Sequence, residues 1–227
     1  GNDGDGVPEG EVIIGSYYGG PNVEILGTKH VSVLSKITSI TNAHTSTDGS
    51  PIPTGSPTDL GVFKIAAAQQ SNNLNGRNKV AINGLTLTVR SQNVQLNTSS
   101  FVLYNTADTN STAGGAKFYT LDGQLITGPT VSGDFLVFFD NLLNSSTNIV
   151  IDAGMSATFA LKATPIQTTN AIYSLQVSLE QFTNPAAAPF GPLGSHIQWL
   201  DKDSGNCQMF NWVDSPNTVV KSITFRN

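Results

Sequence analysis

The sequence has 227 residues, of which 12% are charged, and its formal net charge is −5. Its eleven Lys and Arg residues are scattered and form no basic patch, so composition argues against a nucleic-acid partner. No run of about 18 apolar residues occurs, so we expect no membrane-spanning helix. Ser, Thr, Asn and Gln must supply most of the polar surface, a composition that favours an extracellular or cell-surface protein.

The first ten residues are polar and rich in glycine, with two aspartates one residue apart. Asp3 and Asp5, followed by Gly6, resemble the aspartate-rich calcium loops of thrombospondin type 3 repeats and dockerins. In such a loop Glu9 or Glu11 would complete the oxygen ligands of one calcium ion. The alternative is a solvated, flexible leader that binds no cofactor.

Residues 11–18 predict a short β-strand, which ends at a Gly-Gly-Pro hinge, residues 19–21. An apolar strand behind a polar leader is an aggregation hazard unless it pairs with a sheet. Either the strand folds back on its own sheet, or it inserts into the sheet of the next copy and links copies head to tail. The candidate linking residues are Val12, Ile14 and Tyr18 on one face of the strand and Ile13 and Tyr17 on the other.

Residues 22–227 alternate between apolar and polar positions, and turn residues separate the runs at short spacing. Gly84 marks a bulge in the longest run, and Asp122-Gly123 predicts a two-residue hairpin turn. We therefore predict one all-β domain after the extension 1–21, an antiparallel β-sandwich of jelly-roll or immunoglobulin-like type. The predicted strands are 79–91, 135–140, 148–152, 156–163 and 172–182, with C-terminal strands 196–200, 208–213 and 219–225 within 196–227, and the predicted loops are 40–59 and 183–195.

The sequence gives no arrangement of residues that indicates an enzyme. His30, His44 and His196 have no second ligand at metal-binding spacing and no serine in a nucleophile turn, so we expect solvated strand or loop residues. Three of the four glutamates fall near the N-terminus and leave no carboxylate pair for glycoside hydrolysis. Cys207 is the only cysteine, so it closes no internal disulfide. We expect it to be a small buried residue, with a reactive thiol or a bridge between chains as the alternative.

Two further groups of residues have both a structural and a binding interpretation. Trp199, Trp212 and Tyr173 could form a face on which sugars stack, but their apolar neighbours favour core packing. Asp201 and Asp203 could bind a cation, but a hairpin turn accounts for them as well. We therefore expect both groups to be structural.

The chain carries three acceptor sequences for N-glycosylation, none with proline in the middle position. They are centred on Asn97, Asn110 and Asn144. Asn110 and Asn144 fall in turn-like segments, where a glycan would be accessible. Occupied sites would make the chain a glycoprotein, whereas a sequence this rich in Asn, Ser and Thr also produces matches by chance.

Residues 22–182 resemble the β-sandwich modules of secreted prokaryotic cell-surface proteins. The segment from Gly154 to Ala163 fits the strand pattern Gly-x-Ser/Thr-x-x-Phe-x-Leu-x-Ala of those modules. The arrangement is similar to donor-strand filament subunits, namely archaeal bundling pili or threads and TasA-like biofilm fibres. The resemblance implies an extracellular structural subunit whose partners are copies of itself. The alternative is a carbohydrate-binding or adhesin module of a cell-surface protein.

Overall fold

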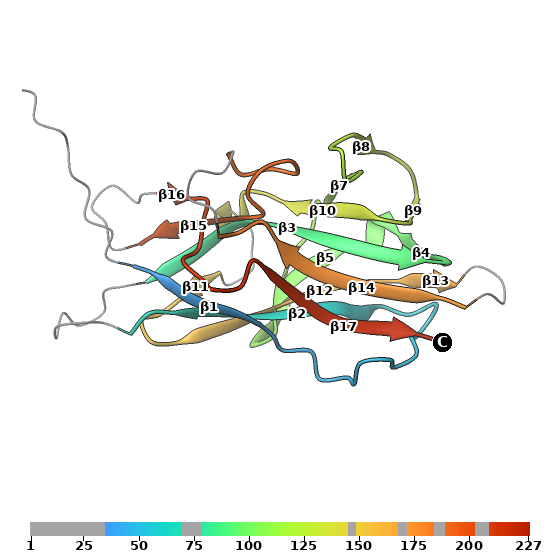
Figure 1. Cartoon of the computed structure of the whole chain (residues 1–227), viewed down its shortest axis with the longest axis horizontal. Coiled ribbons are helices and arrows are strands. Elements are labelled where there is room, and N and C mark those ends of the chain that lie inside the picture. The colour runs from blue at the N-terminus through green and yellow to red at the C-terminus, as the bar shows by residue number, and fades with distance from the viewer. Residues whose placement is uncertain (1–34, 70–78, 145–148, 168–171, 184–188, 203–208) are drawn as a thin grey trace, which may run out of the picture. The chain divides into compact units, whose positions relative to one another are not determined.

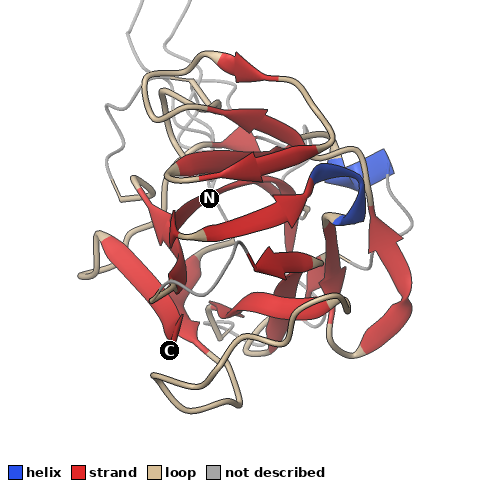
Figure 2. Ribbon diagram, turned by 90° about the vertical axis from the view of Figure 1, so that its right-hand side faces the viewer, coloured by secondary structure: helices blue, strands red, loops and turns tan. Residues whose placement is uncertain are grey.

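Antiparallel β-strands make up most of the backbone in the computed structural model, which describes residues 35–69, 79–144, 149–167, 172–183, 189–202 and 209–227. All of these residues belong to one unit, Val33–Asn227. Within them helical structure is limited to two single 3-10 turns, η1 (Thr98–Ser100) and η2 (Leu142–Asn144), coloured blue in Figure 2. The predicted all-β class is confirmed.

The first sheet has five strands, and the late strand β12 (Ser156–Ala163) lies between two pairs of strands that are consecutive in the chain. From edge to edge the strands are β1 (Ile37–Asn42), β2 (Thr58–Ala67), β12, β5 (Val102–Asn105) and β6 (Asp108–Ala113). β2 and β12 form the centre, where Phe63 lies opposite Phe159. The terminal strands of this sheet are β1 and β6.

The second sheet has nine strands and is built around the long strand β3 (Val80–Gln92). One path runs β16 (Met209–Phe210), β15 (Ile197–Asp201), β3, β10 (Phe135–Phe139), β7 (Lys117–Tyr119) and β8 (Leu125–Ile126). β11 (Val150–Ile151) and β14 (Ser174–Glu180) also pair with β3, and β17 (Val219–Arg226) pairs with β14. In Figure 1, β15 lies at one end of β3, and β14 runs with β17 toward the other.

A third, three-stranded sheet continues strands of the other two. Its order is β13 (Pro165–Gln167), β4 (Val94–Asn97) and β9 (Thr130–Ser132). The chain passes from β3 into β4 through Asn93, whose φ of 56° lies in the left-handed region. This region is costly for most residues, but asparagine tolerates it.

The core lies between the two larger sheets and takes one face of each. β3 contributes Ile82, Leu85, Leu87 and Val89, all buried, as the alternation predicts. The pairing of β15 with β3 shifts register between Ile82 and Gly84, which confirms the predicted bulge. The core cluster also includes Ile65, Phe159 and Leu161 of the first sheet and Phe135, Val137, Leu175 and Phe225 of the second.

The segment 189–196 covers part of the outer face of the second sheet. Phe190 stacks on Phe138 with ring centroids 5.1 Å apart, and a Cβ on Gly84 would lie 2.3 Å from the Phe190 ring. Thr86 and Thr88, which alternation places outward, are nevertheless buried. His196 is only 1% exposed, so the prediction of a solvated histidine is wrong at this position.

Several local predictions differ from the structure. Alternation in 172–182 predicts Ile172 on the core side, but Ile172 is 76% exposed and Tyr173 is buried. Both residues precede β14, which starts at Ser174, two residues after the predicted start. The strand predicted over 208–213 ends at Phe210. The loop predicted over 40–59 is shorter, because its first residues belong to β1 and its last residues to β2. The β7–β8 hairpin exists, but the Thr120 and Gln124 backbones still pair, so its turn has three residues rather than two.

Candidate functional site

Most of the predicted site residues near the N-terminus lie outside the described residues. These are the linking strand, Val12, Ile13, Ile14, Tyr17 and Tyr18, and the calcium candidates Asp3, Asp5 and Glu9. His30, Asp203 and Cys207 also lie outside them. The roles assigned to these residues stay predictions, and the described sandwich is the place to look for the surface that such a strand would meet.

The three glycosylation candidates differ in how free their side chains are. Asn110 is exposed on the terminal strand β6, and Asn144 is exposed at the end of η2. Asn97 is half-buried and caps η1, because its Oδ1 accepts a hydrogen bond from the Ser99 amide at 3.0 Å. Exposure therefore favours Asn110 and Asn144 as acceptors over Asn97.

Strands of four or more residues end the two larger sheets at three places among the described residues: β1, β6 and β17. Each presents main-chain N–H and C=O groups on one side without a neighbouring strand of its own sheet. The loop between β1 and β2 covers one half of the β17 edge. There Gly49 donates to the Thr224 carbonyl at 2.7 Å, and Arg226 donates to the Ser50 carbonyl at 3.2 Å.

A buried carboxylate fixes the residue that precedes β1. Ser35 donates to Asp201 twice, from its Oγ to Oδ1 at 2.7 Å and from its backbone amide to Oδ2 at 3.3 Å. Both residues are buried, so water does not compete for these hydrogen bonds. Lys36 then forms an exposed ion pair with Asp214, with 2.6 Å between Nζ and Oδ2. These contacts fix the position of the backbone just before β1, beside the segment 211–214.

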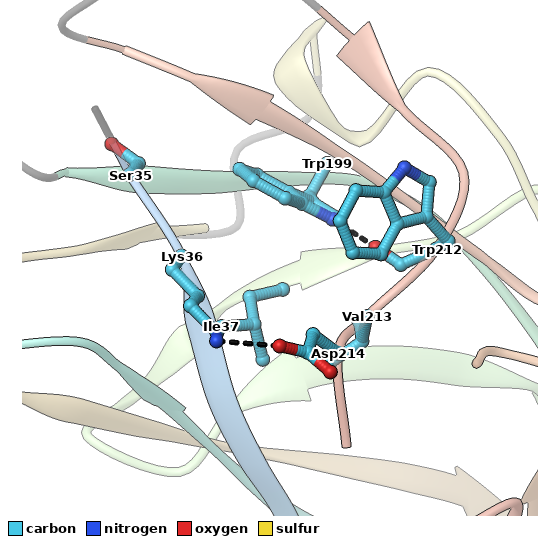
Figure 3. A pocket seen from close by; sticks show the side chains of 7 residues that line it. All are labelled: Ser35, Lys36, Ile37, Trp199, Trp212, Val213 and Asp214. Carbon is cyan, nitrogen blue, oxygen red and sulfur yellow. Dashed lines mark hydrogen bonds and ion pairs between the residues drawn. The ribbon is translucent and has the colours of Figure 1, made fainter. Parts of the chain in front are cut away.

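A pocket of about 240 Å³ opens at this point. Figure 3 shows the ring of Trp212 beside that of Trp199, with the Lys36–Asp214 ion pair near them. Trp199 donates its Nε1–H to the Trp212 carbonyl at 2.7 Å, so its one polar group is used within the protein. The lining residues are Ser35, Lys36, Ile37, Trp199, Trp212, Val213 and Asp214. Ile37 is the first residue of β1, so the pocket lies at the start of that strand.

The expectation that the aromatic residues are structural holds for two of the three. Trp199 and Tyr173 are buried, and the Tyr173 hydroxyl accepts a hydrogen bond from the Ile52 amide at 3.1 Å. Trp212 is only half-buried, and it lies beyond the end of β16. The prediction of a strand over 208–213 places Trp212 inside that strand, but β16 ends at Phe210. A residue beyond the end of a strand need not follow its alternation of buried and exposed positions.

A polar cluster lies on the outer face of the second sheet. Arg90 binds the Glu180 carboxylate through both terminal nitrogens, at 2.5 and 3.3 Å, and Ser178 donates to the same carboxylate at 2.6 Å. Burial alone would raise the pKa of Glu180, but these hydrogen bonds outweigh it and hold the pKa below its ordinary value. Burial lowers the pKa of His196 by more than the Pro192 carbonyl and Glu180 raise it.

A second polar cluster lies on the outer face of the first sheet. Tyr104 donates to the Asp59 carboxylate at 2.8 Å, and Lys162 lies over the Tyr104 ring, 4.4 Å from its centroid. Burial, together with the hydrogen bond to Asp59, raises the pKa of Tyr104. Within the described ranges no three His, Cys, Asp or Glu side chains come together as a metal site. No described helix is long and apolar enough to cross a membrane.

Comparison with known proteins gives likeness in fold only. No family model and no curated protein matches the sequence. Among solved structures, the T6 backbone pilin of serotype M6 Streptococcus pyogenes is similar over 85% of this chain, with 11% identity and a TM-score of 0.26. This chain spans 35% of that three-domain pilin.

Two other solved structures match over most of their own length. AvmM, which catalyses macrocyclization in alchivemycin A biosynthesis, matches with 9% identity and a TM-score of 0.24, over 82% of this chain and 93% of its own. The seventh ScaB type I cohesin from Pseudobacteroides cellulosolvens matches with 11% identity and a TM-score of 0.25, over 83% and 90%. Since these values are low, the function proposed below rests on residues of this chain.

Proposed function

We propose that this chain is a structural subunit of an extracellular filament or surface layer. In this proposal residues 11–18 of one copy add as a strand to a sheet edge of the next copy. An added strand gains main-chain hydrogen bonds along the edge, and its alternating side chains set the register. A head-to-tail contact of this kind does not close on itself, so it propagates.

One observation carries the proposal: the described sandwich leaves both of its larger sheets open. β1, β6 and β17 end these sheets with six to eight residues each, and residues 11–18 have a matching length. The apolar strand in the N-terminal extension therefore has edges of suitable length to pair with. The exposure of Asn110 and Asn144 and the low charge content agree with an extracellular location.

The proposal assigns no catalytic activity to the chain. The cluster around Glu180 is hydrogen-bonded between the neighbouring strands β3 and β14, and the Tyr104–Asp59 hydrogen bond reaches from β5 across β12 to β2. Such links between strands are typical of structural clusters. The carboxylates of these two clusters are held by Arg90 and Tyr104. The Ser178 hydroxyl, which donates to Glu180, is buried and so is closed to a substrate. A calcium ion held by Asp3, Asp5 and Glu9 would serve to order the leader and would take no part in chemistry.

Sedimentation velocity on the full chain tests strand donation. The double variant Ile13→Asp, Ile14→Asp places a charge on each face of the strand, and Asn22→Asp, Thr28→Asp is the matched control, with two charges at polar positions outside residues 11–18. We expect the unmodified chain and the control to sediment as polymers and the double variant as single chains. Polymers of equal size from the double variant would contradict the proposal.

A carbohydrate-binding or adhesin module is the second candidate function, favoured by the half-buried ring of Trp212 beside the Lys36–Asp214 pair. Aromatic faces next to charged groups are suited to sugars, because the ring stacks on the sugar and the charged groups bind its hydroxyls. Binding of a polysaccharide by single chains, lost in Trp212→Ala, would favour this function. A glycan array probed with the non-polymerising double variant measures it directly.

A further inference from the structure

The three long terminal strands differ in how well they are protected against an added strand. Natural sheets protect their edges with charges, proline or covering loops. β17 carries Lys221 and Arg226, both exposed, and the 48–50 loop covers part of its edge. β6 begins with Asp108 and carries the glycosylation candidate Asn110. β1 contains only Ile, Thr, Ser and Asn, with neither charge nor proline.

β1 is also the terminal strand whose first residue, Ile37, lines an apolar pocket. The pocket beside Ile37 is walled by Trp199, Trp212 and Val213. At about 240 Å³ it is smaller than a typical small-molecule site, which occupies about 300–1,000 Å³. An apolar cavity of about 150 Å³ already accepts a benzene ring, so this one has room for one or two apolar side chains.

We propose that the free edge of β1 and the tryptophan pocket together form the acceptor for residues 11–18 of a second copy. Main-chain groups of β1 bind the incoming strand, and one of its apolar side chains fills the pocket between Trp199 and Trp212. This inference rests on the proposed function and assigns its acceptor. The segment has the chemistry that the site requires, since it is extended, apolar and provided with isoleucine, valine and tyrosine side chains.

The rigid entry into β1 supports this assignment. The Ser35–Asp201 hydrogen bonds hold the start of β1 against β15, which carries Trp199. The Lys36–Asp214 ion pair joins it to the segment that carries Trp212. The edge and the pocket therefore keep a fixed spacing. When the incoming strand places a side chain in the pocket, its register along β1 is fixed. A fixed register at every contact is what a regular polymer requires.

Crosslinking of mixed chains tests the acceptor. In a Cys207→Ser background, chains with Ser16→Cys are mixed with chains that carry one cysteine on a terminal strand. The three acceptor variants are Thr38→Cys on β1, Thr109→Cys on β6 and Lys221→Cys on β17, all at exposed positions. A short bismaleimide links neighbouring cysteines, and each variant alone gives the background. We expect a crosslinked dimer at least fivefold more abundant with Thr38→Cys than with the other two.

The pocket is tested within the same assay. Adding Trp212→Ala to the Thr38→Cys chain removes one wall, and we expect at least a tenfold loss of crosslinked dimer, as for truncation of a buried aromatic anchor. Trp212→Phe is the conservative control and is expected to retain most of the crosslinking. Urea unfolding of each variant shows whether the sandwich stays folded. Equal crosslinking with Trp212→Ala would overturn the role of the pocket.

The remaining outcomes separate this inference from the proposed function. A dominant dimer with Thr109→Cys or Lys221→Cys would overturn the β1 acceptor and leave strand donation standing. A chain carrying both Ser16→Cys and Thr38→Cys that crosslinks only within itself would show that the strand pairs in its own chain, and both proposals would fall. Single chains in sedimentation, with background crosslinking at all three strands, would also overturn both.

Discussion

At the scale of single residues, the buried pair of Ser35 and Asp201 holds the start of β1 against β15. Asp201 accepts two hydrogen bonds from Ser35 although it lies in β15, far along the chain. A buried carboxylate is expensive unless its oxygens are hydrogen-bonded, so removing one partner costs more than the contact itself contributes. The sequence suggests a turn or a cation ligand at Asp201, and the structure assigns it to a strand.

Asp201→Ala is expected to lower the free energy of unfolding by about 1–3 kcal/mol, because the buried Ser35 amide loses its acceptor and the Ser35 hydroxyl keeps only the Lys79 carbonyl, 2.8 Å away. Urea unfolding at neutral pH measures this. In a double-mutant cycle with Ser35→Ala, the two losses are expected to be clearly less than additive, since both variants remove the same contact. Additive losses would mean that the two residues stabilise the fold independently.

His196 predicts a loss of stability in mild acid. Burial lowers the pKa of His196 in the folded chain below its ordinary value of 6.5, so the folded state binds a proton less readily than the unfolded state. The stabilisation is complete above pH 6.5 and falls as the pH drops toward the folded pKa, by about 1.4 kcal/mol for each pH unit in that window.

The pH effect is measured by urea unfolding at pH 7.5 and at pH 5, with His196→Gln as a non-titrating variant of similar size. We expect the drop in unfolding free energy between the two pH values to be smaller in the variant. Glu180 contributes at lower pH, because its lowered pKa makes its stabilisation disappear only as the pH falls below about 4.5. An unchanged drop in His196→Gln would contradict the assignment.

At the scale of elements, β2 and β14 approach each other closely through Gly61. A Cβ at position 61 would lie 2.8 Å from the Val177 side chain, so the two sheets have no room for it. Gly61→Ala is expected to destabilise the fold by about 1–3 kcal/mol through overpacking. Thermal or urea unfolding of Gly61→Ala, Val177→Ala and the double variant checks this. The double variant should lose less than the sum of the single losses.

The absence of charge on β1 predicts the effect of adding one. Thr38→Lys and Thr41→Lys place lysines at exposed positions on an edge that we assign as the acceptor. Because charged side chains at an edge disfavour strand addition, we expect polymer mass in sedimentation to fall strongly in this double variant. Thr109→Lys on β6 is the matched control and should polymerise normally. The reverse pattern would identify β6 as the acceptor.

At the scale of the whole molecule, the alternation of the sequence predicts the all-β sandwich and most of its strands. The β3 core positions and the Gly84 bulge follow from periodicity alone, because a half-buried strand must alternate. Alternation fails where a distant segment covers an outer sheet face. Thr86 and Thr88 point to the outer face of the second sheet and are nevertheless buried, as is His196. No local pattern in the sequence indicates that 189–196 packs on this face, where Phe190 lies against Gly84 and Phe138.

The candidate site shows the same limit. The donor strand can be predicted from its own composition, whereas its acceptor depends on the order of strands in the sheet. The sequence does not show which strands end a sheet, because that depends on the order of strands in the folded chain. Among the described residues the long terminal strands are β1, β6 and β17. Trp212 is another case, because it is partly exposed where β16 has already ended at Phe210. The apolar residues that continue to Val213 predict a longer strand.

Electron microscopy of the purified full chain beside a variant lacking residues 1–20 tests the central claim most directly. The account predicts filaments or ordered layers from the full chain and separate particles from the truncated one. Separate particles from both would contradict polymerisation. Filaments from both would contradict donation by the N-terminal strand.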